Sequence, residues 1–375
     1  MKKLKVVTVV GTRPEIIRLS RVIAALEKNF NHILIHTGQN HDFELNEVFF
    51  NELDIKTPKY FLEANKKSPM LAIGDILSKI DRILDKIKPD AFLVLGDTNS
   101  CLSAIAAKRK KIPIFHMEAG NRCFDERVPE ETNRKIVDHI ADINLTYSKI
   151  SREYLLREGL NPDQIIKTGS PMNEVISFYD KKIKDSKILT KLKIQPNQYY
   201  LVSCHREENV DDPSNLRNLV NSLNTLAKLK RFPIIISMHP RTRKNIRKIK
   251  LDLHKLIRIC KPFGYIDYIN LQKNSKAVLS DSGTITEESS ILNFPALNIR
   301  DAHERPEGME EGAVMMTGLN TDRIMQGLKI LENQPKGEQR ILNIVDDYQT
   351  KNVSQKVVRI ILSYIDYVNK NVWKK

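Results

Sequence analysis

Short runs rich in β-branched residues alternate with longer amphipathic segments along this chain of 375 residues. Residues 5–10 (KVVTVV) precede a segment of helical period at 14–28, and residues 90–97 (DAFLVLGD) precede another at 100–111. Strands that are largely apolar, each followed by a helix, are typical of parallel sheets buried on both faces. The alternation therefore predicts an α/β fold built from βα units.

The candidate strands fall into two sets. The first set comprises residues 5–10, 32–37, 90–97, 113–118 and 143–148, and the second comprises 199–205, 232–239, 256–262, 277–283 and 295–301. A chain of this length suits two domains rather than one core. Helical periodicity weakens near residue 173. We expect two Rossmann-like doubly wound domains, at 1–173 and 174–375, with a cleft between them. The last apolar helix, at 354–373, could pack on either domain.

The net charge of +15 admits nucleic acid, an anionic membrane or a phosphorylated substrate as partner. The lysines are dispersed, and no zinc finger, aromatic RNA-binding signature or heptad seam accompanies them, so nucleic acid is not expected. No apolar run approaches the roughly 20 residues that cross a bilayer, so no membrane association is expected. The first apolar run ends in Gly-Thr-Arg, which predicts a strand rather than a signal peptide, and hence a cytoplasmic protein. A nucleotide-linked substrate is the simpler anionic partner.

Polar clusters follow the predicted strands. They lie at residues 11–15 (GTRPE), 96–99 (GDTN), 116–118 (HME), 205–209 (HREEN), 239–241 (HPR) and 281–284 (DSGT). In open parallel sheets, ligands bind beyond the carboxyl ends of the strands. These clusters therefore mark the expected ligand site, with both domains contributing.

Two of the clusters suit an anion. Ser282, Gly283 and Thr284 would present backbone N–H groups at a helix N-terminus, where the helix dipole favours a phosphate. A plain helix cap followed by glutamates explains the same residues equally well.

The second cluster that suits an anion is GTRPE at residues 11–15, which is accompanied by two arginines. Arg13 begins a predicted helix, where its guanidinium could bind a diphosphate in a bidentate manner, or could tie down the turn through Glu15. Arg18 lies about one helical turn beyond Glu15 and could point to the same place.

Acid–base chemistry is the best interpretation of the remaining clusters. His116 and Glu118 are two residues apart on a predicted strand, so they are expected to share one face. No third metal ligand at suitable spacing is evident and the four cysteines form no CxxC pair, so no metal is expected. Carboxylates near arginines favour Glu118 and Asp97 as catalytic groups. The alternatives are a salt bridge from Glu118 to Arg122 and a helix cap for Asp97. His205 could face the same cleft or be structural.

Nine motifs occur in order between residue 4 and about residue 360. They are GTRPE, HTGQ, LVLGDT, HMEAGNR, VPEETNR, GSPMNE, CHREEN, DSGTITEE and RDAHERPE. Together they resemble the non-hydrolysing UDP-N-acetylglucosamine 2-epimerase family, whose fold looks like the glycosyltransferase B architecture. The resemblance implies a homodimer that binds a UDP-sugar without any cofactor. It also implies anti elimination of UDP to a 2-acetamidoglycal, followed by re-addition with the C2 proton returned from the opposite face.

The resemblance assigns roles position by position. Asp97, Glu118 and Glu130 match the catalytic carboxylates of the family, and His205 matches its histidine near the diphosphate. Arg122 and Arg134 are expected to hold the intervening loop and its charges and to lie at the substrate. The remaining expected substrate contacts are Arg13, Arg18, His239, Ser282, Gly283, Thr284, Glu288 and Arg305.

Several motifs depart from the commoner members of the family. Arg18 stands in place of a lysine, HMEAGNRCF in place of a Leu-Arg-Thr-Gly version, and Thr284 in place of a second glycine. The residues after Gln39 also differ from those that bind a regulatory UDP-sugar, which puts that control in doubt. These variants look like the UDP-N-acetyl-L-fucosamine synthase branch, which epimerises UDP-2-acetamido-2,6-dideoxy-L-talose at C2 for capsule or O-antigen synthesis.

Other activities remain open at the level of the sequence. The first alternative is interconversion of UDP-N-acetylglucosamine and UDP-N-acetylmannosamine. A retaining glycosyltransferase of the same fold would bind a similar UDP-sugar but would require an acceptor. A hydrolysing epimerase would release UDP and a free sugar, and a UDP-sugar sensor would bind without turnover.

Overall fold

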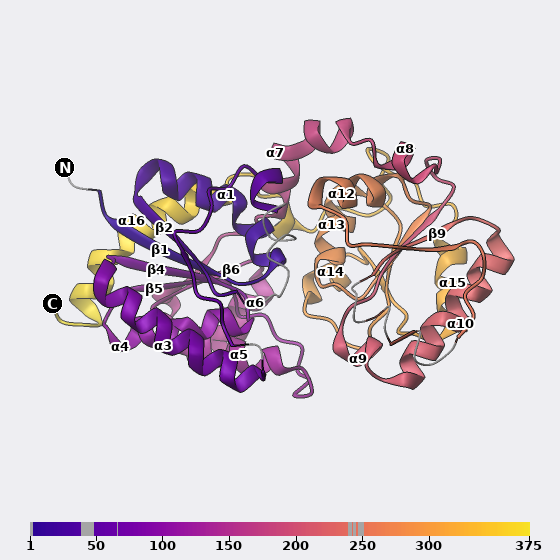
Figure 1. The fold of residues 1–375 in the computed structure, drawn as a ribbon. Helices are drawn as coiled ribbons and strands as arrows, with labels where there is room; N and C mark the ends of the chain where they lie inside the picture. The colour runs from indigo at the N-terminus through magenta and orange to yellow at the C-terminus, as the bar shows by residue number, and fades with distance from the viewer. Residues whose placement is uncertain (1–2, 39–48, 66, 239–241, 243–244, 247–250) are drawn as a thin grey trace. The chain divides into compact units, whose positions relative to one another are not determined.

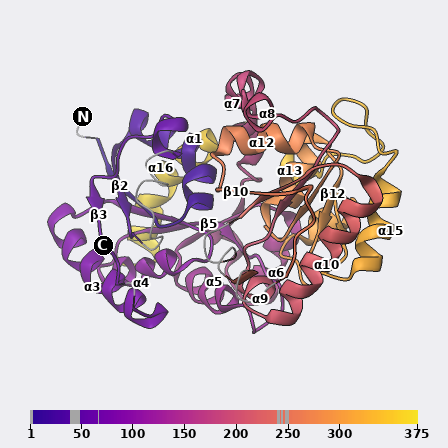
Figure 2. The same ribbon diagram turned by 45° about the vertical axis from the view of Figure 1, so that its right-hand side comes forward.

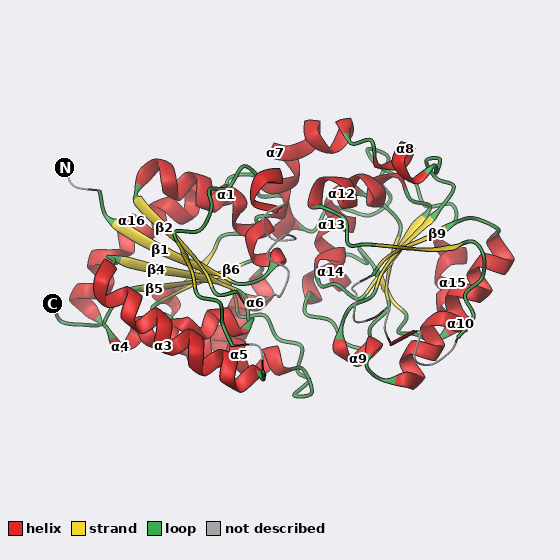
Figure 3. Cartoon of the chain, viewed as in Figure 1, coloured by secondary structure: helices red, strands yellow, loops and turns green. Residues whose placement is uncertain are grey.

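The computed structural model describes all residues except 1–2, 39–48, 66, 239–241, 243–244 and 247–250. The chain forms two compact units (Figure 1). The first comprises Met1–Ser177 together with Asp347–Lys375, and the second comprises Phe178–Asp346. In each unit the strands lie at the centre and the helices surround them (Figure 3). We describe each unit separately.

A parallel sheet forms the core of the first unit. Among the described residues its strands are β1 (Lys5–Val10), β2 (Asn31–His36), β3 (Tyr60–Phe61), β4 (Ala91–Leu95), β5 (Ile114–Ala119), β6 (Ile143–Thr146) and β7 (Ile165–Lys167). Their order is β3-β2-β1-β4-β5-β6-β7, and every paired strand is parallel. Strand β4 is buried along its whole length, as a parallel strand covered on both faces should be.

Helices cover both faces of this sheet. They are α1 (Arg13–Asn29), α3 (Pro69–Ile87), α4 (Ala104–Arg109), α5 (Pro129–Ile140), α6 (Lys149–Arg157), α7 (Met172–Asp185, which crosses the boundary) and α16 (Val353–Asn371), with short 3₁₀ helices at Asn99–Ser103, Pro162–Gln164 and Asp346–Tyr348. Helices α1 and α16 contact each other on one face, and α3, α4 and α5 follow one another on the other face (Figures 1 and 2).

The second unit repeats this plan. Its strands are β8 (Tyr200–Ser203), β9 (Ile234–Ser237), β10 (Ile257–Cys260), β11 (Ala277–Ser280), β12 (Ala296–Asn298) and β13 (Met315–Met316), in the parallel order β10-β9-β8-β11-β12-β13. Its helices are α8 (Ile188–Leu192), α9 (Glu207–Val210), α10 (Pro213–Lys230), α12 (Tyr265–Asn274), α13 (Thr284–Leu292), α14 (Pro306–Glu310) and α15 (Thr321–Leu331). The sequence thus predicted both parallel sheets, whereas the short strands β3, β7 and β13 were not anticipated.

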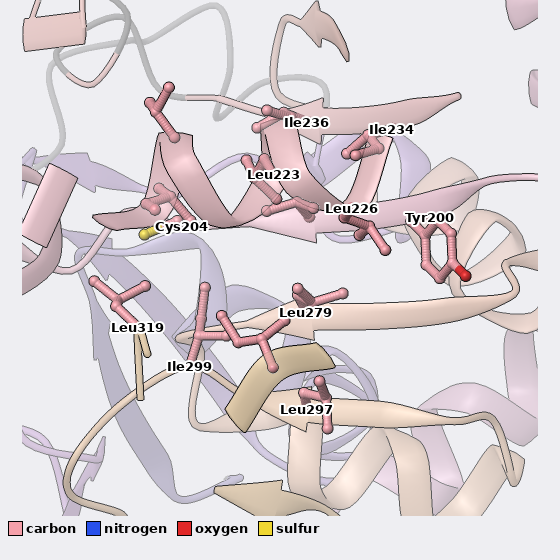
Figure 4. Close-up of a cluster of buried hydrophobic side chains, with 14 of the residues drawn as sticks. Tyr200, Cys204, Leu223, Leu226, Ile234, Ile236, Leu279, Leu297, Ile299 and Leu319 are labelled. Atoms are coloured by element: carbon pink, nitrogen blue, oxygen red, sulfur yellow. The ribbon is translucent and has the colours of Figure 1, made fainter. Parts of the chain in front are cut away.

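Alternate residues of the second sheet pack into opposite layers. Tyr200 and Val202 of β8 pack into a cluster that includes Leu223 of α10. Figure 4 shows Tyr200 and Leu223 in this cluster. Leu201, between them, joins a cluster on the other face that includes Ile285 of α13. This period of two, typical of a strand, places helices on both sides of the sheet.

The predicted domain limits differ from the observed units. The sequence placed one boundary near residue 173 and assigned 174–375 to the second domain, whereas the units divide at Ser177 and again after Asp346. Helix α16 accounts for the second division. Its residues Val357, Ile361 and Ile365 recur every four positions and are buried, and the helix packs on α1. Packing on the first unit was one of the two options that the apolar pattern left open.

Each sheet has a switch point, where the strand order reverses. It lies between β1 and β4 in the first sheet and between β8 and β11 in the second. Four of the polar clusters follow these four strands, and the cluster at 116–118 ends β5, the neighbour of β4. Ligands of such sheets bind beside switch points. Within the part of the chain described above, no helix is long and apolar enough to span a membrane.

Candidate active site

One buried glutamate links the loops that follow β1 and β4. The carboxylate of Glu15 accepts the N–H groups of Gly11 at 2.5 Å and Thr12 at 2.9 Å. Its other oxygen accepts the hydroxyl of Thr98, which follows Asp97, at 2.5 Å. Burial raises the pKa of Glu15 from 4.5 to about 7, although these hydrogen bonds oppose the change. Glu15 therefore fixes both loops at the switch point.

Asp97 is held by an arginine of α5. The guanidinium of Arg134 donates to the same oxygen of Asp97 from Nε at 3.1 Å and from a terminal nitrogen at 2.5 Å. Its other terminal nitrogen donates to Glu131 at 2.9 Å. The side-chain amide of Asn133 donates to the carbonyl of Asp97 at 2.9 Å. Arg134 is only 2% exposed, so its expected role in holding the loop suits this geometry better than a direct substrate contact.

Glu118 lies at an irregularity in β5. The pairing with β6 shifts register between Met117 and Ala119, and Glu118 adopts a left-handed conformation with φ of 65°. This β-bulge interrupts the regular alternation of side chains on which the prediction of a shared face for His116 and Glu118 depended. The carboxylate of Glu118 forms an ion pair with Arg18 and accepts from the amide of Asn121 at 3.2 Å.

Arg122 binds protein groups rather than lying open to a substrate. It is 2% exposed and donates to both carboxylate oxygens of Glu158, at 2.7 and 2.6 Å. A further nitrogen donates to Asp138 and to the carbonyl of Asn121, both at 2.7 Å. The salt bridge from Arg122 to Glu118, which the sequence left as an alternative, is not formed, because Arg122 bonds Asp138 and Glu158 instead. The geometry therefore argues against the predicted substrate contact and supports the predicted role in holding the loop.

Glu130 and Glu131 occupy the first turn of α5 but have different surroundings. Glu130 is partly exposed, whereas Glu131 is fully buried. Besides Arg134, Glu131 accepts the thiol of Cys123 at 3.1 Å and the N–H of the same residue at 3.2 Å. Glu131 thus anchors the loop between β5 and α5, a role that the sequence did not reveal because both glutamates follow Pro129 in the same helical turn.

In the second unit, Asp281 organises the loop after β8. One oxygen accepts the N–H groups of His205 and Arg206, each at 2.9 Å, and the amide of Asn209 at 3.2 Å. The other oxygen lies 3.2 Å from Nδ1 of His205. Burial alone would raise the pKa of Asp281, but His205 and the backbone N–H groups lower it below the ordinary value. Asp281 therefore holds the backbone of this loop and lies beside the half-exposed side chain of His205.

The predicted anion site lies at the start of α13. Gly283 precedes the first residue of this helix, and the hydroxyls of Ser282 and Thr284 lie 3.0 Å apart. Further along the helix, buried Glu288 accepts the side-chain amide of Gln272 at 2.6 Å. No motif in the sequence pointed to Gln272, because it lies within the separate helix α12.

The remaining predicted contacts have varied positions. The guanidinium carbon of Arg13 lies 5.6 Å from the centre of the Phe49 ring. Arg305 is buried and donates to Glu287 at 3.4 Å, which argues against an open substrate contact. His239 and the segment after Gln39 lie outside the described residues.

The arrangement suits proton transfer. Asp97 and Glu118 follow or end the adjacent strands β4 and β5, and each carboxylate has a guanidinium partner, Arg134 and Arg18 respectively. Among the residues that the structure describes, no group of three or more His, Cys, Asp or Glu side chains is placed to hold a metal ion. Two carboxylates at the ends of neighbouring strands, as Asp97 and Glu118 are, can accept a proton and return one.

Comparison with known proteins decides the family. The sequence profile of the family described as UDP-N-acetylglucosamine 2-epimerase matches residues 24–362. The chain belongs to this family. The structure of the UDP-N-acetylglucosamine 2-epimerase from Rickettsia bellii is 52% identical, covers all of both chains and superposes with a TM-score of 0.94. The chain is thus a non-hydrolysing UDP-N-acetylhexosamine 2-epimerase, an isomerase.

Two further structures bear on ligand and fold. The crystal structure of the Methanocaldococcus jannaschii UDP-GlcNAc 2-epimerase, in complex with UDP-GlcNAc and UDP, is 34% identical, covers 96% of this chain and all of its own, and has a TM-score of 0.89. A glycosyltransferase from Rickettsia africae is 17% identical over 97% of this chain and 94% of its own, with a TM-score of 0.51, which shows the fold alone. The predicted family and the glycosyltransferase B-like architecture are confirmed. Both of the epimerases, from Rickettsia bellii and from Methanocaldococcus jannaschii, are named for UDP-N-acetylglucosamine.

Proposed function

We propose that this epimerase interconverts UDP-N-acetylglucosamine and UDP-N-acetylmannosamine. The observation that carries the proposal is the pair of carboxylates, Asp97 and Glu118, at the ends of neighbouring strands. Inversion at C2 requires one group that removes the proton from one face and another that returns a proton from the opposite face. The Rickettsia bellii and Methanocaldococcus jannaschii relatives, both named for the glucosamine substrate, support this choice of sugar.

The reaction balances without an oxidant or a cofactor. A carboxylate accepts the C2 proton, the electrons of the C2–H bond form a double bond between C1 and C2, and the C1–O bond breaks with its electron pair on the β-phosphate of UDP. The 2-acetamidoglycal and UDP then recombine in the reverse sense, with a proton delivered to the other face of C2. Since both steps develop charge, fixed ionic groups at the site stabilise them.

The first unit supplies the groups for the sugar in this proposal. Asp97, Glu118 and Glu130 act on the reacting carbons and their protons. Arg134 holds Asp97 through two donors on one oxygen, and Arg18 neutralises Glu118. Such pairing keeps each carboxylate in one position, which matters because proton transfer requires close approach.

The second unit supplies the groups for UDP. The backbone N–H groups at Gly283 and Thr284, at the N-terminus of α13, suit a phosphate. His205, whose backbone N–H bonds Asp281 and whose ring lies 3.2 Å from it, is suited to the charge on the leaving diphosphate. Glu288, held by Gln272, is suited to the hydroxyls of the ribose. Homodimerisation stays a prediction from the family.

A second substrate is favoured by particular residues. UDP-2-acetamido-2,6-dideoxy-L-talose, converted to UDP-N-acetyl-L-fucosamine for capsule or O-antigen synthesis, is the substrate implied by the variants in the motifs. Those residues are Arg18, Asn121, Cys123 and Thr284. Arg18 and Asn121 contact Glu118, whereas Cys123 contacts Glu131 and Thr284 begins α13. Arg18 and Asn121 therefore lie close enough to a proposed catalytic acid to influence the choice of sugar.

Proton NMR with each UDP-sugar in separate reactions tests the proposal. A new anomeric signal from UDP-N-acetylglucosamine is expected, and turnover of the 6-deoxy-talose sugar alone would transfer the assignment to the second substrate. Turnover of neither would contradict both.

A matched pair of variants distinguishes an enzyme from a UDP-sugar sensor. Glu118→Gln should abolish turnover while UDP binding, measured by calorimetry, is retained. Glu126→Gln is the control, because Glu126 lies in the loop after β5, is exposed and pairs with Lys135. Equal activity of the two variants would contradict the catalytic role of Glu118.

A further inference from the structure

A buried histidine that the proposed reaction does not use lies on β5, one of the two strands that lead to the proposed catalytic carboxylates. His116 of β5 has no exposed surface. Its Nε2 lies 2.8 Å from the carbonyl oxygen of Gly96, the residue before Asp97. Its Nδ1 lies 2.9 Å from a carboxylate oxygen of Asp138 on α5. The imidazole therefore connects the loop after β4 to a helix that also borders the loop after β5.

The partners of His116 decide its protonation state. A carbonyl oxygen can only accept a hydrogen bond, so Nε2 must carry a proton that it donates to Gly96. An ionised carboxylate is also an acceptor only, so Nδ1 must carry a second proton. Asp138 is held in its ionised form independently of His116, because its oxygens also accept from the guanidinium of Arg122 at 2.7 Å and from the N–H of Gly120 at 3.2 and 3.1 Å. An ionised Asp138 therefore requires an imidazolium at His116.

Asp138 also holds the residues that flank Glu118. Its two oxygens accept the N–H of Gly120 at 3.2 and 3.1 Å, and one of them accepts Arg122 at 2.7 Å. Gly120 has φ of 79°, and a Cβ there would lie 2.3 Å from the carbonyl oxygen of Ser151. The loop after the β-bulge is thus tightly packed, and Asp138 anchors it two residues from the carboxylate of Glu118.

We propose that His116 is a positioning residue, held as an imidazolium between Gly96 and Asp138, which fixes the loops of Asp97 and Glu118 relative to each other. The inference rests on the proposed function, because it assigns catalysis to those two carboxylates. His116 touches neither the substrate nor the reacting atoms in this scheme. It acts through the backbone at Gly96 and, through Asp138, through the backbone at Gly120.

Nitrogen-15 NMR of the histidine-labelled free protein tests the protonation state without any substrate. Both ring nitrogens of His116, assigned by the loss of their signals in His116→Gln, should carry a proton at neutral pH. In Asp138→Asn the side-chain amide can donate to Nδ1, so Nδ1 should lose its proton while Nε2 keeps one. A wild-type His116 with one unprotonated nitrogen would overturn the proposal. This result is independent of whether any UDP-sugar is turned over.

Kinetics test the positioning role. His116→Gln should lower kcat about 10²-fold and change KM by less than about threefold, because a displacement of roughly 1 Å has that effect on a proton transfer. His32→Gln is the matched control, since His32 of β2 bonds Thr8 of β1 in the same sheet and contacts neither loop. An unchanged kcat in His116→Gln would overturn the proposal. Inactive wild-type protein would instead overturn the proposed function.

Discussion

Glu15 makes the stability of the first unit depend on pH in a way that one substitution can isolate. The carboxyl group is 2% exposed and lies among the N–H groups of Gly11 and Thr12 and the hydroxyl of Thr98. In Glu15→Gln the amide oxygen can still accept both N–H groups, and the amide nitrogen can donate to the hydroxyl. The variant therefore copies the protonated glutamic acid and removes only its titration.

The magnitude follows from the two pKa values of the carboxyl group. Below pH 4.5 the folded and unfolded states are both protonated at Glu15. Between pH 4.5 and 7 the folded state keeps its proton while the unfolded state loses it, so the free energy of unfolding falls as pH rises. A difference of about 2.5 between the pKa values corresponds to about 3 kcal/mol above pH 7. For a unit of about 200 residues this corresponds to roughly 6–12 °C in Tm.

Thermal unfolding of both proteins at pH 5, 6, 7 and 8 measures the effect. The Tm of Glu15→Gln relative to wild type should rise steadily between pH 5 and 7 and then stay constant. Glu27→Gln removes the same charge near the other end of α1, where the side chain is only partly buried and lies 3.5 Å from Lys56, and serves as the control. A Tm difference that is the same at all four pH values would refute the reasoning, because it would mean that Glu15 titrates alike in both states.

Three further substitutions test other parts of the account. Arg134→Gln leaves the buried Glu131 without its cation, so it should destabilise by about 3–5 kcal/mol and also lower kcat, measured by denaturation and turnover. Asp281→Ala removes the acceptor for His205 and its neighbour, so calorimetry should show UDP binding weakened by about tenfold; unchanged affinity would contradict the role given to this loop. Gly120→Ala should lower Tm more than Gly159→Ala. Both glycines have positive φ, but only at Gly120 would the new Cβ meet backbone atoms. An equal loss of Tm in the two variants would contradict a role for this contact, because the positive φ that both share would then explain the whole loss.

Much of the architecture follows from periodicity. Continuous apolar runs such as 91–95 and 234–236 are recognisable because a parallel sheet buries both faces, and the polar residues that follow them mark the strand ends. The two-residue strands β3 and β13 were not predicted, since two residues are too few to show a period. The place of α16 was undetermined because an apolar stripe does not specify its partner.

The site shows a similar division. Sequence could identify Asp97 and Glu118, which follow or end strands, but their ionic partners depend on tertiary structure. Arg18 lies 100 positions from Glu118, and Arg134 lies 37 positions from Asp97. The β-bulge at Glu118 was also not predictable, because its sequence resembles a regular strand end. Arg122 was expected at the substrate from the family resemblance, with a salt bridge to Glu118 as the alternative, whereas folding places Asp138 and Glu158 around it.

The central claim is that the enzyme inverts C2 by elimination and re-addition of UDP. The most direct test incubates the protein with UDP-N-acetylglucosamine in D₂O and follows both the UDP-sugars and any free sugar by NMR and mass spectrometry. The account predicts one deuterium at C2 in both epimers, with no free N-acetylmannosamine. An epimer that keeps its original C2 hydrogen, or release of UDP and a free sugar as the products, would contradict it.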